Sequence, residues 1–88
     1  MMLSEEMVNA VSLVKSSNYR YAVLKAIGDT VATPSELAKK TKLRLNHVSM
    51  VLKELKEANL AACLNENAKK GRLYTLTEKG KNVVSLIQ

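Results

Sequence analysis

The 88-residue sequence is long enough for one compact domain with a small core. It has no Phe, no Trp and a single cysteine, Cys63, so neither an intrachain disulfide nor a zinc site of several cysteines can form. Its formal net charge of +6 favours encounters with polyanions, which makes nucleic acid the first partner to consider.

The composition argues against a membrane protein and against an enzyme. No apolar run approaches the roughly 18 residues that span a bilayer. Glu5 and Glu6 interrupt an N-terminal stretch that lacks the basic leader of a signal peptide, so we expect a soluble, cytoplasmic protein. One His, one Asp and one Cys, with no phosphate-binding loop, form no catalytic group, so we expect no enzyme, no cofactor and no metal site.

Amphipathic patterns predict two helices in the first third of the chain. Residues 3–15 carry apolar side chains at three- and four-residue steps, and Ser4 is placed to cap this helix. A second helix is expected over 19–27, where Gly28 would end it. The connector 29–33 is long enough for a brief extended segment.

Two further helices follow in close succession. Thr33, Pro34 and Glu36 have the spacing of a capping box with proline at the first helical position, which predicts a helix over 34–41. Another helix is expected over 45–59. Its apolar stripe has helical spacing and consists of Val48, Val51, Leu52, Leu55 and Ala58.

From residue 60 onward the pattern becomes extended. Residues 61–64 and 72–76 are predicted to pair as a β-hairpin around the polar, flexible segment 65–71. A last helix is expected over 77–88, although Gly80 makes its first residue hard to predict. The expected fold class is therefore mostly α with a small β-hairpin (α+β), in a single domain over 1–88.

The helices over 34–41 and 45–59, joined by a tight turn, have the form of a helix-turn-helix. Steps of about 100° per residue, counted from an inward-facing Val48, define the outward face of the second helix. This face carries Asn46, Ser49, Met50 and Lys53. Such side chains can contact base edges, phosphates or a thymine methyl group in a major groove. The alternative is an ordinary solvated face, which every amphipathic surface helix has.

Basic side chains flank this helix in two groups, one before or within the turn and one at the hairpin tip. They are Lys39, Lys40, Lys42 and Arg44 in the first group, and Lys69, Lys70 and Arg72 in the second. Because Lys and Arg neutralise phosphates, this arrangement favours nucleic-acid binding. His47 is either a further contact to a base or phosphate, or a surface histidine with no special role.

Three segments together resemble winged-helix regulators of the MarR and ArsR type, especially small archaeal members. They are residues 35–41 (SELAKKT), 47–55 (HVSMVLKEL) and 71–80 (GRLYTLTEKG). The resemblance covers about residues 19–80 and implies a winged helix-turn-helix with extra N- and C-terminal helices. It also implies DNA binding, with 45–59 as the recognition helix and 61–76 as the wing. The positions that such proteins turn toward DNA correspond here to Arg44, Asn46, His47, Ser49, Met50 and Lys53.

This chain departs from the pattern of those regulators in the turn and on the recognition helix. Lys42 and Arg44 stand where the family often has Gly and Ser, so the helix lacks a cap of about 1 kcal/mol but gains a cation near the phosphates. Met50 stands where arginine is common, so no base preference carries over. The metal-binding cysteines and histidines of some ArsR-like sensors are absent, and metal sensing is not expected.

In relatives of this type, terminal helices often build a dimer interface. Leu3, Met7, Ala10 and Val14 follow the 4-3-4 spacing of an interhelical seam. We therefore expect a homodimer that forms through Leu3, Met7, Val14 and the C-terminal helix. The alternative is that these side chains cover the core of their own domain.

The predicted function is that of a sequence-specific, double-stranded DNA-binding transcription regulator, acting as a homodimeric repressor. The main alternative is a winged-helix protein-interaction module of transcription or replication machinery, because a fold does not by itself decide function. RNA binding is less favoured, because the sequence offers no aromatic platform for stacking bases.

Overall fold

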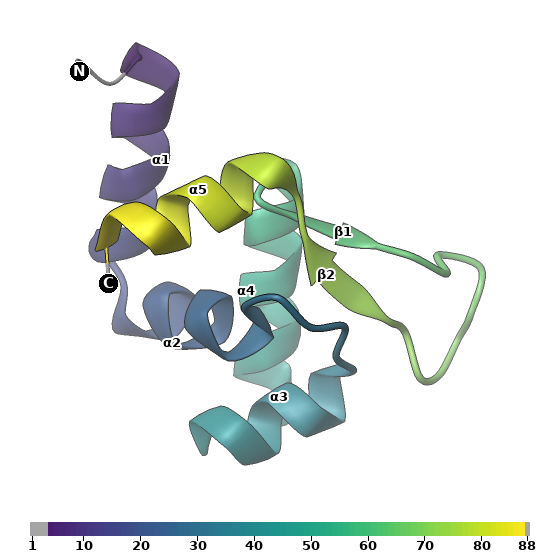
Figure 1. Cartoon of the computed structure of the whole chain (residues 1–88). Coiled ribbons are helices and arrows are strands. Elements are labelled where there is room, and N and C mark those ends of the chain that lie inside the picture. Colours follow the sequence, from purple (N-terminus) through teal and green to yellow (C-terminus); the bar gives the residue numbers. More distant parts are fainter. Residues whose placement is uncertain (1–3, 88) are drawn as a thin grey trace.

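The computed structural model of the chain describes residues 4–87. Residues 4–87 form five helices and a two-stranded antiparallel hairpin, and Figure 1 shows how these elements are arranged. In chain order the elements are α1 (Glu5–Lys15), α2 (Asn18–Ile27), α3 (Pro34–Thr41), α4 (Leu45–Glu57), β1 (Ala61–Cys63), β2 (Tyr74–Leu76) and α5 (Glu78–Ile87). The predicted fold class, mostly α with a small hairpin, is confirmed.

Local capping decides where the first three helices begin. The Ser4 hydroxyl accepts a backbone hydrogen bond of 3.1 Å, and α1 begins directly after it. The predicted start of this helix, at Leu3, lies outside the described residues. Ser17 caps α2 in the same way, so this helix begins one residue earlier than predicted. Thr33 and Glu36 form the predicted capping box of α3, with both reciprocal hydrogen bonds present.

The helix α4 ends two residues before its predicted end at Asn59. Asn59 has a φ of 62°, in the left-handed region, where the helix cannot continue. The backbone N–H of Leu60 then donates to the carbonyl of Leu55 (2.8 Å), a bond that closes the end of the helix and directs the chain into β1.

The two strands of the hairpin are shorter than predicted. Cys63 at the end of β1 lies opposite Tyr74 at the start of β2. One further backbone bond, from Leu64 N–H to the Leu73 carbonyl (2.8 Å), extends the pairing beyond the strands. After that point the side chain of Asn65 replaces the backbone ladder, as described below.

The connector 29–33 contributes a short extended segment to the hairpin, as predicted. Ala32 exchanges both backbone hydrogen bonds with Tyr74, at 2.9 and 2.8 Å. Because Thr33 caps α3 immediately afterwards, this bridge holds the beginning of α3 beside β2.

The core lies where α2, α3, α4 and α5 meet the base of the hairpin (Figure 1). Its largest fully buried side chains are Val14, Val23, Leu24, Ile27, Leu37, Val48, Leu52, Leu55, Leu60 and Val83. All of them are aliphatic, and none of the three tyrosines is among them.

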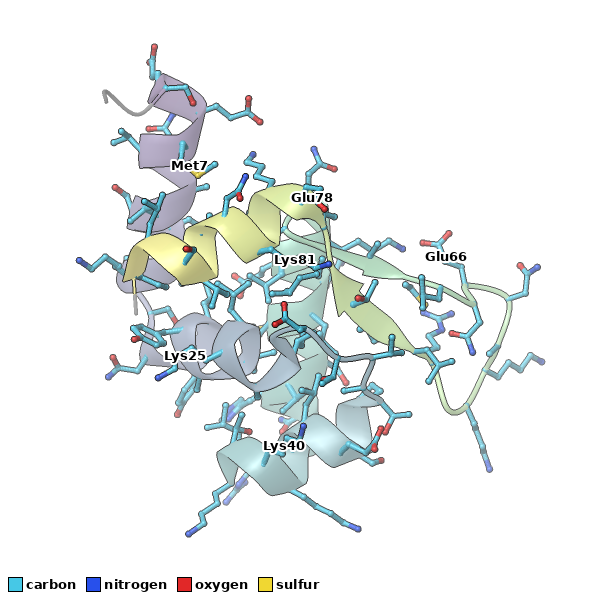
Figure 2. All side chains as sticks on the ribbon, viewed as in Figure 1. Met7, Lys25, Lys40, Glu66, Glu78 and Lys81 are labelled. Atoms are coloured by element: carbon cyan, nitrogen blue, oxygen red, sulfur yellow. The ribbon has the colours of Figure 1, made fainter. Side chains whose placement is uncertain are left out.

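The helix α1 belongs to this core, since it packs against both α2 and α5. Val14 is 0% exposed and Ala10 is 5% exposed within a single chain. The predicted role of Val14 in a dimer contact is therefore wrong, because a partner cannot reach a side chain that is already buried. Figure 2 shows Met7 on the side of α1 that faces α5, where it is partly buried against the core. Leu3 lies outside the described residues.

Arg20 connects three helices through its guanidinium group. Its Nη2 and Nε donate to the two carboxylate oxygens of Glu54 in α4, at 2.8 and 3.3 Å. Its Nη1 donates to the Leu13 carbonyl (3.1 Å) and to the Ser16 hydroxyl (3.3 Å) at the end of α1. Hydrogen bonding to Arg20 also lowers the pKa of the Glu54 carboxyl below its ordinary value of 4.5.

Replacing Arg20 with methionine is expected to lower the free energy of unfolding by about 1–2 kcal/mol, because several charge-assisted hydrogen bonds are lost. The side chains of Arg20 and Glu54 are 21% and 39% exposed, so screening by solvent keeps the effect small. The folded-state pKa of Glu54 is lowered, so the stabilisation is present above the ordinary pKa and is lost as pH falls through the folded-state value. Urea unfolding should therefore show a difference at pH 7 that shrinks in acid. If the two proteins differed in free energy of unfolding by as much in acid as at pH 7, this account would be wrong.

Candidate nucleic-acid interface

The turn between α3 and α4 is built by local hydrogen bonds and one left-handed residue. The Thr41 hydroxyl donates to the Leu37 carbonyl (2.7 Å) and accepts from Leu43 N–H (3.3 Å). Lys42 between them has a φ of 61°, a conformation that glycine adopts at lower cost. Arg44 occupies the N-cap position of α4 and makes no capping hydrogen bond with its side chain, as the sequence predicted. The side chains of Lys42 and Arg44 are both exposed.

The helix α4 has separate buried and exposed faces, as its sequence period predicts. Val48, Val51, Leu52 and Leu55 are at most 3% exposed. The opposite face is solvent-accessible and carries Asn46, Ser49, Met50 and Lys53. The structure thus confirms that these four side chains are available for contact, while their contacts with DNA stay a prediction.

His47 lies at the side of α4, between these two faces. Its ring stacks on Tyr19 of α2, with ring centroids 5.1 Å apart and an interplanar angle of 26°. The histidine is half-buried as a result, whereas Tyr19 remains exposed. This stacking gives His47 a packing role that the sequence did not indicate, and it leaves part of the ring accessible.

Asn65 gives the polar loop of the hairpin a defined shape. Its Oδ1 accepts from Leu73 N–H (2.7 Å), and its Nδ2 donates to the Gly71 carbonyl (3.3 Å). Its backbone carbonyl accepts from Ala68 N–H (2.9 Å). Arg72 adds a bond from Nε to the Ala68 carbonyl (2.8 Å). The segment predicted to be flexible because it is polar thus uses those polar groups to fold on itself.

A groove of about 680 Å³ lies between the start of α3, the exposed side of α4 and the hairpin loop. We call it the basic groove. It is lined by Thr33, Pro34, Ser35, Leu45, Ser49, Lys53, Lys56, Lys69, Lys70, Gly71, Arg72 and Tyr74. It brings together five of the predicted site residues, Ser49, Lys53, Lys69, Lys70 and Arg72. The other five, Lys42, Arg44, Asn46, His47 and Met50, do not line it, although all of them lie in or beside the first two turns of α4.

Lys56 is a groove residue that the sequence did not point to. It forms an ion pair with Glu66 of the hairpin loop. Their hydrogen bond raises the pKa of the Lys56 ammonium group and lowers the pKa of the Glu66 carboxyl. Ser35, at the start of α3, also lines the groove and was not predicted as a site residue.

Residues 4–87 contain no group of three or more His, Cys, Asp and Glu side chains that could hold a metal ion. Nor do they include a helix long and apolar enough to cross a lipid bilayer.

The architecture has clear counterparts among solved structures. TubR from Bacillus thuringiensis serovar israelensis, solved bound to 24 bp of tubC, superposes with a TM-score of 0.79 at 15% identity, over 98% of this chain and 94% of TubR. The MarR family transcription regulator SP03579 superposes with a TM-score of 0.68 at 20% identity, over 90% of this chain and 58% of that protein. The fold is a winged helix. ZitR from Lactococcus lactis shares 27% identity with a TM-score of 0.70, over 80% of this chain but only 49% of ZitR. No protein-family model and no curated protein matches the sequence.

We refer to the hairpin over residues 61–76 as the wing, and to α3, α4 and the turn between them as the helix-turn-helix. The uncapped start of α4 leads to a prediction about stability. Arg44→Ser is expected to raise the free energy of unfolding by about 1 kcal/mol, because a serine at the N-cap accepts a backbone N–H that has no side-chain partner here. Urea unfolding of the purified variant measures the change. An alanine at the same position is the matched control, since it removes the cation without supplying a cap, and equal stabilities of the two variants would contradict the prediction.

Proposed function

We propose that this protein is a double-stranded DNA-binding transcription regulator of the MarR/ArsR type. In this proposal α4 is the recognition helix in the major groove, and the wing contacts the adjacent backbone. The observation that carries it is the basic groove, where α4 and the wing present lysine side chains to the same space. The resemblance to small archaeal members stays a prediction.

The exposed face of α4 supports a division of roles among its side chains. Asn46 and Ser49 each offer a hydrogen-bond donor and acceptor to base edges, and Met50, which is 56% exposed, suits a thymine methyl group. Lys42 and Arg44 lie at the start of the helix, where phosphates border a major groove. Lys53 reaches a guanine edge or a phosphate.

The proposal includes a two-fold dimer whose recognition helices enter successive major grooves about 34 Å apart. Val8 of α1 and Leu86 of α5 are large apolar side chains that are 46% and 48% exposed, on the two terminal helices that pack together. They favour these helices as the place of contact, in place of the buried Val14. Light scattering after size exclusion should give twice the 9.7 kDa mass of one chain. Repression by occupying a promoter is the simplest consequence.

Fluorescence anisotropy on a random-sequence duplex, titrated at several salt concentrations, tests the central proposal. Each phosphate that is neutralised should contribute about 0.9 to the slope of log affinity against log salt. A steep slope supports DNA binding. Absence of binding at low salt would overturn it and favour the protein-interaction module, for which the exposed apolar side chains of Leu45 and Met50 on α4 are the supporting observation.

Lys53→Ala tests the role of α4 in sequence recognition. Once an operator has been selected from a random pool, the variant should lose about 1–3 kcal/mol of specific binding, while its affinity for random duplexes falls less. Lys81→Ala removes the same charge from an exposed position on α5, outside the basic groove, and is the control. If both variants bound the operator equally well, Lys53 would have no role in recognition.

A further inference from the structure

Lys56 differs from the other lysines of the basic groove in having an acidic partner. Within residues 4–87, the ion pairs include Lys56 with Glu66 but none with Lys53, Lys69 or Lys70. All four lysines line the groove in which the proposed function places a DNA backbone. The inference that follows rests on that proposed function.

Glu66 is held beside Lys56 by the fold of the loop. Figure 2 shows Glu66 where β1 passes into the loop of the wing. It directly follows Asn65, whose side chain bonds to Leu73 N–H and to the Gly71 carbonyl and so fixes this part of the chain. The backbone next to Glu66 is therefore held by bonds within the loop, which places its carboxylate within reach of Lys56 on α4.

The ion pair is exposed enough to be exchanged. The side chains of Lys56 and Glu66 are 44% and 57% exposed, so water already competes with their contact. A DNA phosphodiester in the groove offers Lys56 an equivalent anionic oxygen. When Lys56 neutralises that phosphate, counterions leave the DNA, and their release favours the exchange.

We propose that Lys56 is a further phosphate-binding residue and that Glu66 occupies its ammonium group in the free protein. DNA binding then replaces a carboxylate with a phosphate on Lys56. Because the exchange involves the backbone and not the bases, Glu66 lowers the affinity for every duplex alike and restrains non-specific binding.

Anisotropy on the random-sequence duplex, with the wild type, Glu66→Gln, Lys56→Gln and the double variant, tests this inference. Glu66→Gln should tighten binding several-fold with little change in salt slope, since the contact to Lys56 is made in both proteins. Lys56→Gln should weaken binding and flatten the slope by about 0.9. In the Lys56→Gln background, Glu66→Gln should have no more effect than Glu57→Gln, which removes a charge from an exposed position on α4 that forms no ion pair with another of residues 4–87.

The outcomes separate this inference from the function on which it rests. Wild-type binding with a steep salt slope upholds the proposed function whatever the variants do. Weaker or unchanged binding by Glu66→Gln would then overturn the inference. An equal tightening in the Lys56→Gln background would also overturn it, because the effect of Glu66 would then act through bulk charge or through the neighbouring Arg72 and not through Lys56. If the wild type bound no duplex, the proposed function and this inference would both be overturned. Matching thermal unfolding curves confirm that the five proteins, the Glu57→Gln control included, are equally folded.

Discussion

Gly80→Ala is expected to lower the free energy of unfolding by about 3 kcal/mol, a large share of the roughly 5–15 kcal/mol that keeps a domain folded. Gly80 lies in α5, where it is buried against the residue that precedes β1. A Cβ atom at this position would lie 2.1 Å from the carbonyl oxygen of Leu60 and 3.3 Å from the Cβ of Leu76. The first distance is far inside van der Waals contact, and the atom it meets belongs to the backbone.

Neither side of this contact can move without loss of hydrogen bonds. The Leu60 carbonyl accepts from Thr77 N–H (3.1 Å). The Thr77 hydroxyl donates to the Asn59 carbonyl (2.6 Å) and accepts from Gly80 N–H (3.1 Å). These bonds hold the start of α5 directly against the end of α4, so relief of the clash requires the helix to separate from the hairpin.

Urea unfolding followed by circular dichroism measures the effect of Gly80→Ala. Ser85→Ala, at an exposed position of the same helix, is the control and should change stability little. Alanine is favoured over glycine by about 1 kcal/mol in an ordinary helix interior, so helix propensity alone predicts the opposite sign. A variant as stable as the wild type would show that α5 does not approach Leu60 as described.

Lys69→Ala combined with Lys70→Ala is expected to weaken binding to all duplexes by about 10- to 100-fold near physiological salt and to flatten the salt slope by about 1.8. Both side chains are exposed at the wing and line the basic groove. Because the proposed function assigns them to phosphates and not to base edges, the loss should be the same for a selected operator and for random sequence.

Lys39→Ala combined with Lys40→Ala provides a matched control. These two lysines are also adjacent and exposed, and their replacement removes the same charge. They lie at the end of α3, outside the groove. Figure 2 shows Lys40 on α3, well apart from the wing. A smaller loss in the control supports the assignment of the wing. Equal losses in the two double variants would contradict a special role of the wing. They would mean either that net charge alone governs affinity or that the basic group before the turn contributes as much as the wing.

The helix-turn-helix was predictable from the sequence because its signals are local. Thr33 and Glu36 exchange hydrogen bonds within one helical turn, so their spacing alone predicts the start of α3. Val48 and Leu55, seven positions apart, lie on the same face of a helix whatever surrounds it, and both are buried as expected. The lack of a capping side chain at Arg44 was also predictable, because a helix cap depends only on the residue at the start of the helix.

The wing was predicted only in outline. The change to an extended pattern located the hairpin, but the polar residues between its strands suggested a flexible tip. In the structure Asn65 bonds to Leu73 N–H, eight positions further along the chain. An asparagine that follows a strand is a weak signal of a turn, and nothing in the sequence shows which N–H its side chain meets.

The contacts that shape the candidate interface were not predictable, because each joins residues far apart in the sequence. Arg20 meets Glu54 across 34 positions, and the partner of Lys56 is a loop residue on another element. The spacing of Val14 fits an interhelical seam equally well whether the facing helix belongs to a partner or to the same chain. The fold resolves this ambiguity in favour of the chain's own core.

The sequence by itself determined the order of the elements, the two faces of α4 and the positive charge of the surface beside it. Caps, helical period and net charge depend only on neighbouring residues or on their sum. The tertiary structure decided how α4, the start of α3 and the wing enclose one groove, which lysines enter it, and why residue 80 must be glycine. These properties depend on the distance between segments that the chain brings together only when it folds, and no local pattern encodes that distance.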